Sequence, residues 1–104
     1  MIVEYIRYKV EKDRRQEFID AYIKASTQLN ASEYCLAYEI SECEEELGSF
    51  IVRIEWTSTD EHINGFRKSN VFPEFFTIVK PFFNDIQEMR HYKLTNINKR
   101  KYTP

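Results

Sequence analysis

Residues 50–56 most strongly constrain how this chain can fold, because every second side chain there is apolar while Ile51, Arg53 and Glu55 occupy the positions between. The alternation has the period of a β-strand that buries one face. The apolar positions are Phe50, Val52, Ile54 and Trp56. Ser58 and Glu61 follow directly and form the pattern of a capping box, which satisfies free backbone amides at the start of a helix. The segment therefore predicts a strand that turns at once into a helix.

Three further strands are predicted at 2–10, 34–42 and 86–93. The first is rich in β-branched and aromatic residues, and the second alternates in polarity. The alternation of the second would place on one face Tyr34, Leu36, Tyr38 and Ile40. A turn at 44–48 separates this strand from the one that ends at Trp56. These two strands should therefore pair as neighbours.

Two longer helices complete the set of elements. Asp13 is expected to cap the first, which ends near Asn30. Its buried face is marked at helical spacing by Phe18, Tyr22, Ala25 and Leu29. The other begins between Asn70 and Pro73, where proline is tolerated in a first turn. Together with the short helix after Ser58, it makes a second helical region in two pieces.

The resulting order, β-α-β-β-α-β, is typical of an α+β, ferredoxin-like fold, in which an antiparallel sheet carries its helices on one face. A chain of 104 residues forms one domain. We expect that domain to span 1–94, followed by a polar C-terminal tail at 95–104.

Charge and apolar runs argue against two classes of partner. The net charge of −2 provides no positive field for nucleic acid. The apolar run 75–79 is interrupted by Lys80 and Pro81 and is far too short to span a membrane. The first residues lack the basic start and apolar stretch of a signal peptide. We therefore expect a cytoplasmic protein without nucleic-acid or membrane partners.

The sheet face away from the helices is predicted to carry charges at mid-strand. The residues concerned are Arg53 and Glu55, with Arg7, Glu39 and Arg90 as further candidates. Charges mixed with Ile51 and Tyr5 suit neither open solvent nor a dry core. They suit a second sheet packed face to face, with charges paired across the seam. We therefore expect a homodimer through the open sheet face; a monomer with a solvated sheet is the alternative.

The corner after Trp56 is the predicted functional site. Trp56 points toward the helices, and the capping box places His62 in the first turn of its helix. The helix dipole disfavours a positive charge there, so the imidazole should be neutral at pH 7 and able to act as a general base. Phe66, Phe72 and Phe76 would complete an apolar slot for a flat phenol or quinol. Ordinary core packing is the alternative interpretation.

No metal site is expected from the sequence. The only two histidines, His62 and His91, have no third ligand at a spacing typical of metal sites. His91 alternates with Arg90 and Tyr92 on the last strand and could face the dimer seam instead. The two glycines are isolated, so no glycine-rich phosphate loop is predicted either.

Residues 2–8, 50–56, 66–72 and 88–92 resemble the antibiotic biosynthesis monooxygenase superfamily, whose dimeric α/β-barrel proteins include quinol monooxygenases. The likeness covers about 2–93. It implies a dimeric barrel that oxidises a small quinol- or phenol-type aromatic with dioxygen and uses no metal, flavin or other cofactor. The deprotonated substrate would itself reduce dioxygen, while the protein removes the proton and excludes water.

The same resemblance implies two site residues and leaves one alternative. Trp56 matches a tryptophan that these proteins often carry at the end of the third strand, and His62 stands where a polar aromatic residue or histidine commonly begins the next helix. The antibiotic-tailoring members place an asparagine where this chain has Val52. The absence of this asparagine favours the alternative that the chain is a non-catalytic small-ligand-binding or regulatory module of the same fold. Haem degradation is not expected, because the iron-ligating histidine of that branch would fall at Phe76.

Overall fold

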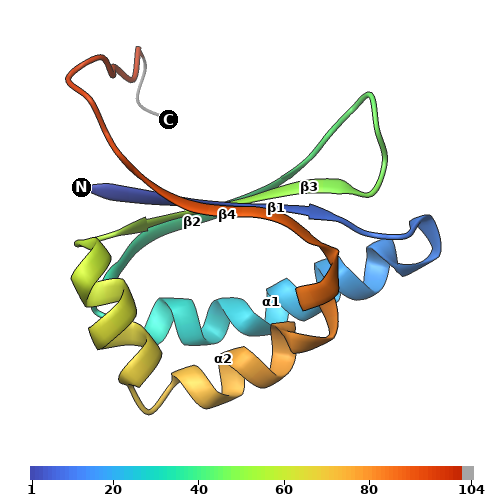
Figure 1. Ribbon diagram of the computed structural model, residues 1–104, viewed down its shortest axis with the longest axis horizontal. Helices are drawn as coiled ribbons and strands as arrows, with labels where there is room; N and C mark the ends of the chain where they lie inside the picture. Colours follow the sequence, from blue (N-terminus) through green and yellow to red (C-terminus); the bar gives the residue numbers. More distant parts are fainter. Residues whose placement is uncertain (102–104) are drawn as a thin grey trace.

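The computed structural model describes residues 1–101, which form a four-stranded antiparallel sheet with its helices on one face (Figure 1). The strands are β1 (Ile2–Lys9), β2 (Cys35–Glu42), β3 (Ser49–Trp56) and β4 (Ile86–Lys93), in the sheet order β2-β3-β1-β4. The helices are α1 (Arg15–Ala31) and α2 (Phe72–Val79). This arrangement confirms the predicted α+β, ferredoxin-like fold.

Short helical segments join these elements. Three are 3₁₀ turns, at Lys12–Arg14, Phe66–Lys68 and Lys80–Asp85, and a π-helical turn spans Glu61–Gly65. The break in the second helical region is confirmed, because Ser69 is extended between the 3₁₀ turn that ends at Lys68 and α2, which begins at Phe72 with Pro73 in its first turn. At its other end α2 gives way to a 3₁₀ turn that contains Pro81. A proline cannot continue the α-helical hydrogen-bond ladder.

The core lies between the sheet and α1. The predicted helical face is confirmed, since these four side chains are buried: Phe18, Tyr22, Ala25 and Leu29. They pack against the predicted apolar face of β3, which is also buried: Phe50, Val52, Ile54 and Trp56. Phe18 lies at the centre of this layer, with its ring centroid 4.5 Å from that of Phe50.

Two local predictions were wrong. Asp13 does not cap α1, because a 3₁₀ turn occupies Lys12–Arg14 and the helix starts without a side-chain cap. In β2, a register shift between Cys35 and Ala37 puts Cys35 opposite Trp56. The bulge breaks the alternation, and Leu36 is consequently 52% exposed.

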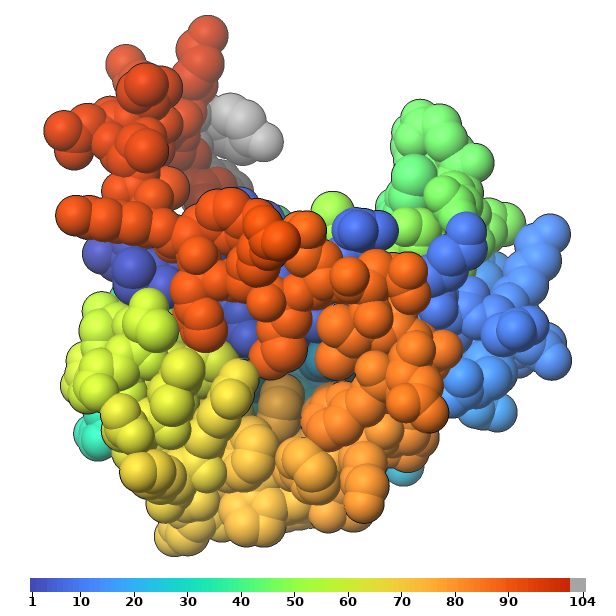
Figure 2. All heavy atoms as spheres, viewed as in Figure 1, coloured from blue at the N-terminus to red at the C-terminus, as the bar shows by residue number. Residues whose placement is uncertain are grey.

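The open face of the sheet carries the predicted mid-strand charges. Arg53 contacts Glu55, with 2.6 Å between Nη1 and Oε2, and its Nε donates to the Tyr5 hydroxyl at 3.2 Å. On β4, Arg90 pairs with Glu88 at 3.9 Å. Figure 2 shows a broad hollow above the sheet, between the β2–β3 hairpin in green and the segment after β4 in red.

The segment after β4 has no helix or strand up to residue 101. The tail predicted at 95–104 extends beyond the described residues, since 102–104 lie outside them. Among residues 1–101, none of the helices has the length and apolar character needed to cross a membrane.

Glu42 ties the start of α1 to the β2–β3 hairpin. Its carboxylate accepts hydrogen bonds from Arg15 Nε at 2.6 Å, from Arg15 Nη2 at 2.7 Å and from the Gly48 amide at 2.9 Å. The Arg15 guanidinium, followed by the Gly48 amide, lowers the pKa of Glu42 to about 2. Glu42 is therefore the carboxylate whose charge matters to the fold.

We predict that Glu42→Gln lowers the free energy of unfolding at pH 7. Because the folded pKa is depressed, the contribution is present above the unfolded value of 4.5 and is lost as the pH falls toward about 2. Urea unfolding from pH 2 to pH 7 should show wild type and variant converging in acid. Glu44→Gln, at an exposed position of the turn that follows the same strand, is the control and should follow wild type throughout. A pH-independent difference would contradict the assignment.

Candidate functional site

An indole and an imidazole stack where β3 meets the following helix. Ser58 accepts a hydrogen bond from the Glu61 amide at 3.0 Å through its hydroxyl, and one from the His62 amide at 3.1 Å through its carbonyl. This local capping, which the sequence predicted, turns the chain so that His62 lies over Trp56. The two rings are nearly parallel, at 12°, with centroids 4.2 Å apart. Both side chains are buried.

Gly65 allows this helical segment to approach the sheet closely. A β-carbon at Gly65 would lie 2.6 Å from the Tyr34 ring. The Thr57 amide, at the start of the turn, donates to the Tyr34 carbonyl at 3.0 Å. The segment is thus fixed against Tyr34, the residue before β2, at both ends of the turn that carries His62. Single π-helical turns such as Glu61–Gly65 are frequent at functional sites.

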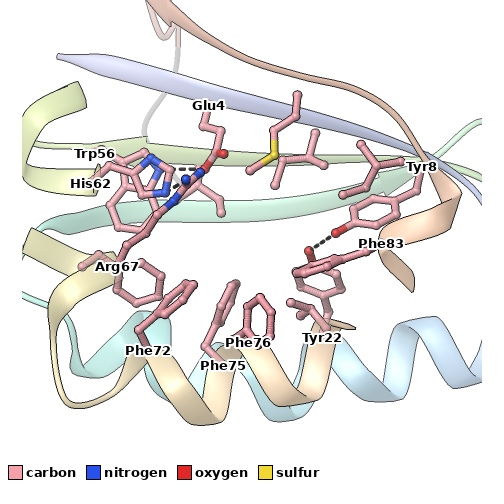
Figure 3. Close-up of a pocket in the computed structure, with 16 residues that line it drawn as sticks. Glu4, Tyr8, Tyr22, Trp56, His62, Arg67, Phe72, Phe75, Phe76 and Phe83 are labelled. Carbon is pink, nitrogen blue, oxygen red and sulfur yellow. Dashed lines mark hydrogen bonds and ion pairs between the residues drawn. The ribbon is translucent and has the colours of Figure 1, made fainter. Parts of the chain in front are cut away.

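A cavity of about 670 Å³ lies between the sheet and α2 (Figure 3). All five residues predicted for the slot line it: Trp56, His62, Phe66, Phe72 and Phe76. Its volume lies within the range of small-molecule sites. Most of the other lining residues are apolar or aromatic, and Phe75, Phe83 and Met89 are among them. The polar groups gather at the Trp56 end, while the Tyr8 and Tyr22 hydroxyls, 2.7 Å apart, face each other at the opposite end.

Sequence reasoning missed two charged lining residues, Glu4 and Arg67, of which Glu4 is buried. Glu4 is 1% exposed, and the Trp56 indole N–H donates to its Oε1 at 3.0 Å. Its other oxygen, Oε2, has no hydrogen-bond partner among the described residues. Burial raises the pKa of Glu4, and the indole hydrogen bond and the Arg67 charge partly oppose that shift. The available signal was a lone carboxylate on the face that Ile6 and Tyr8 also occupy.

His91 faces the cavity side of the sheet, so its suggested place at the dimer seam was wrong. The β1–β4 register sets His91 directly opposite Glu4, on the same face. Its Nε2 lies 2.7 Å from His62 Nδ1, and one nitrogen donates while the other accepts. The neighbours Arg90 and Tyr92 consequently point to the open face. This strand pairing joins residues that are far apart in the sequence.

The imidazole of His62 is held neutral mainly by burial. Its pKa is lowered to about 3 by burial first, then by the positive charge of Arg67 and by His91. Burial and Arg67 also lower the pKa of His91. The predicted neutral state thus has desolvation as its main cause, whereas the sequence argument invoked the helix dipole. The Nε2 of His62 lies 3.7 Å from Glu4 Oε1, too far for a hydrogen bond.

Glu4, His62 and His91 form a group that could hold a metal ion. One ligand atom from each lies within 4.8 Å of the other two. The prediction considered only spacing along the sequence, at which the two histidines have no third ligand. Spacing along the sequence could not reveal it, because Glu4 is brought there by pairing between the first and last strands.

Comparisons with known proteins agree with the ferredoxin-like class of this fold. A proposed antibiotic biosynthesis monooxygenase from Bordetella bronchiseptica superposes with a TM-score of 0.79 and 20% identity, over 90% of this chain and 96% of that one. A conserved protein from Methanosarcina mazei Go1 superposes with a TM-score of 0.75 and 18% identity, over 90% of this chain and 92% of that one.

The family follows from the sequence match. The family model described as antibiotic biosynthesis monooxygenase matches residues 1–77. The chain therefore belongs to that family. The uncharacterized protein YczJ of Bacillus subtilis (strain 168) is 24% identical over 93 residues, covering 89% of this chain and 98% of YczJ.

We predict that the indole N–H of Trp56 and the carboxylate of Glu4 are energetically coupled. Trp56→Phe removes the one hydrogen bond to a buried carboxyl group, which should cost about 1–3 kcal/mol beyond the loss of packing. In a Glu4→Met background the same change should cost less, because no polar group is left unsatisfied. A double-mutant cycle by urea unfolding measures the difference, expected at about 0.5–3 kcal/mol. Strictly additive costs would contradict the coupling.

Proposed function

We propose that this protein is a monooxygenase that oxidises a small quinol- or phenol-type aromatic with dioxygen, without a cofactor. His62 accepts the substrate proton, and Trp56, Phe66, Phe72 and Phe76 form the walls around the ring. The observation that carries the proposal is a neutral, buried imidazole in the wall of an apolar cavity. Membership of the antibiotic biosynthesis monooxygenase family supports the reaction class.

The cavity suits a flat, apolar ring with one acidic hydroxyl. Aromatic side chains line its helix side and offer faces and edges for a planar ligand. The acid–base groups lie together at the Trp56 end, so a substrate hydroxyl would reach His62 only in one orientation (Figure 3). Holding the ring in that orientation supplies the positioning part of catalysis.

The reaction balances with the substrate as the only reductant. The hydroxyl proton passes to the His62 imidazole, and the aromatic anion gives one electron to dioxygen. The resulting radical and superoxide combine to form a carbon–oxygen bond. The oxygen–oxygen bond then breaks, so one oxygen atom stays in the product. The other leaves as water with the two hydrogens that the substrate has lost.

Arg67 is suited to stabilise the anions of this sequence. It lines the cavity, and its charge lowers the pKa of Glu4 and of both histidines. Figure 3 shows Arg67 extending toward the corner that holds Glu4 and His62. A phenolate or superoxide formed there would be attracted to this charge.

We predict that His62→Phe lowers the rate of oxygen uptake with a panel of hydroquinones by about 10²–10⁴-fold, the usual contribution of a general base. Phenylalanine keeps an aromatic ring against Trp56 and removes the proton acceptor, together with its hydrogen bond to His91. Ile63→Ala, at an adjacent exposed position outside the cavity lining, is the control and should keep the wild-type rate.

Two results would overturn this assignment. Equal rates for wild type and His62→Phe would exclude His62 as the base. Hydroquinones that raise the melting temperature of the wild type without any oxygen uptake would support the small-ligand-binding or regulatory module instead.

The open sheet face supports a second proposal, a homodimer formed by packing two such faces together. The hollow in Figure 2 lies over this face, and Arg53 and Glu55 form an ion pair on it. Ile51, at mid-strand in β3, is 43% exposed and would be covered. The dimeric character of the family's barrels agrees with this arrangement.

We predict that Ile51→Glu converts the dimer to a monomer, because it would bury an unpaired charge at the seam. Light scattering at micromolar concentration should give twice the chain mass of 12.6 kDa for wild type and the single mass for the variant. Ile23→Glu, at a 65% exposed position on α1, is the matched control and should remain dimeric. A wild type of monomer mass would exclude the dimer.

A further inference from the structure

We infer that Glu4, His62 and His91 form a binding site for one divalent first-row transition-metal ion, and that the bound ion blocks the proton acceptor of the cavity. Three potential ligand atoms, one from each residue, lie within 4.8 Å of one another. They come from β1, from the helix after β3 and from β4, so the folded sheet is needed to assemble them.

The unpaired oxygen of Glu4 is an independent indication of a ligand. Its side chain is 1% exposed, and Oε2 has no hydrogen-bond partner among the described residues. A buried carboxylate oxygen without a partner is costly. A cation bound between Glu4 and the two imidazoles would satisfy this oxygen. The Trp56 indole already donates to Oε1 and orients the carboxylate, the usual task of a residue behind a metal ligand.

The spacing of the three groups is close to what a metal ion requires. Two ligand atoms at zinc–nitrogen distance in a tetrahedral site are about 3.3 Å apart. One ligand atom from each residue lies within 4.8 Å of the others, and His62 Nδ1 lies 2.7 Å from His91 Nε2. An ion would take only one nitrogen of each imidazole. Side-chain rotations that bring these nitrogens and a Glu4 oxygen to the tetrahedral spacing would replace the hydrogen bond between the imidazoles by coordination.

The donor set selects the kind of metal. Two imidazoles and one carboxylate, with the remaining positions open, are typical of zinc and non-haem iron(II) sites. Magnesium and calcium prefer oxygen ligands, so this set disfavours them. The open positions would face the aromatic cavity, because Glu4 and His62 both line it.

The positive charge of Arg67 repels a metal ion, so a substitution of Arg67 tests whether the ion binds at these three residues. Its positive charge acts on all three groups, since it lowers the pKa of each of them. Replacing it by methionine should strengthen metal binding by removing a repulsive charge. The same change should slow oxidation by removing a charge that stabilises the substrate anion. A substitution that merely unfolded the protein would weaken metal binding and slow oxidation together, so tighter binding with slower oxidation cannot come from a loss of folding.

The link to activity rests on the proposed function, whereas metal binding itself does not. An ion on His62 takes a lone pair of the imidazole that would accept the substrate proton. Zinc should therefore inhibit oxygen uptake, and EDTA should restore it. The inhibition assay needs turnover, but the binding assay needs only the folded chain.

The experiment titrates EDTA-treated, desalted protein with Co²⁺, followed by visible ligand-field absorption, and with Zn²⁺, followed by calorimetry. We expect one ion per chain. Glu4→Gln and His91→Phe should each weaken binding by more than about 100-fold, because losing an outer-shell partner alone costs 10–100-fold. Glu74→Gln, which removes an exposed carboxylate on α2, should bind as wild type does, and Arg67→Met should bind more tightly.

The inference is overturned if wild type binds no Zn²⁺ or Co²⁺, or if Glu4→Gln and His91→Phe bind as wild type does, which would mean adventitious surface sites. His91 is only half-buried on an edge strand, so His91→Phe remains informative if Glu4→Gln fails to fold. A failed titration would leave the oxidation test of His62→Phe intact. Absent turnover would likewise leave the metal titration interpretable.

Discussion

A buried carboxylate held by an indole is the interaction on which the rest of the site depends. Trp56 donates to Glu4 across the central strand pair, and His62 stacks on the same indole. One side chain therefore serves two others: its edge binds the carboxylate, and its face positions the imidazole. The arrangement keeps polar groups in a region that is otherwise apolar, where the electrostatic interactions between them are stronger than in water.

The cavity arises from an incomplete helix layer over the sheet. The long helix α1 covers β3 and buries Phe18 and Leu29, whereas the second helical region is broken around α2 and Pro81. Phe72, Phe76 and Phe83 point from this broken region toward the sheet without filling the space (Figure 3). The polar corner lies at the Trp56 end of this empty volume.

Local signals in the sequence predicted the fold and half of the site. The alternation in residues 50–56 and the capping pattern at Ser58 place Trp56 and His62, because both act over a few residues. Glu4 and His91 could not be placed in the same way, since their meeting depends on the register of the first and last strands. The bulge beside Cys35 was hidden for a related reason: an extra residue in a strand leaves no mark in residue type.

The central claim is that burial against Trp56 keeps the His62 imidazole neutral in the cavity wall. NMR titration of the ring nitrogens of His62 in ¹⁵N-histidine-labelled, EDTA-treated protein tests it most directly. The account predicts that His62 stays neutral from pH 8 down to pH 5, consistent with a pKa of about 3. A His62 ring that takes up its proton near its ordinary value of 6.5 would contradict the account, because such a ring would be in contact with water.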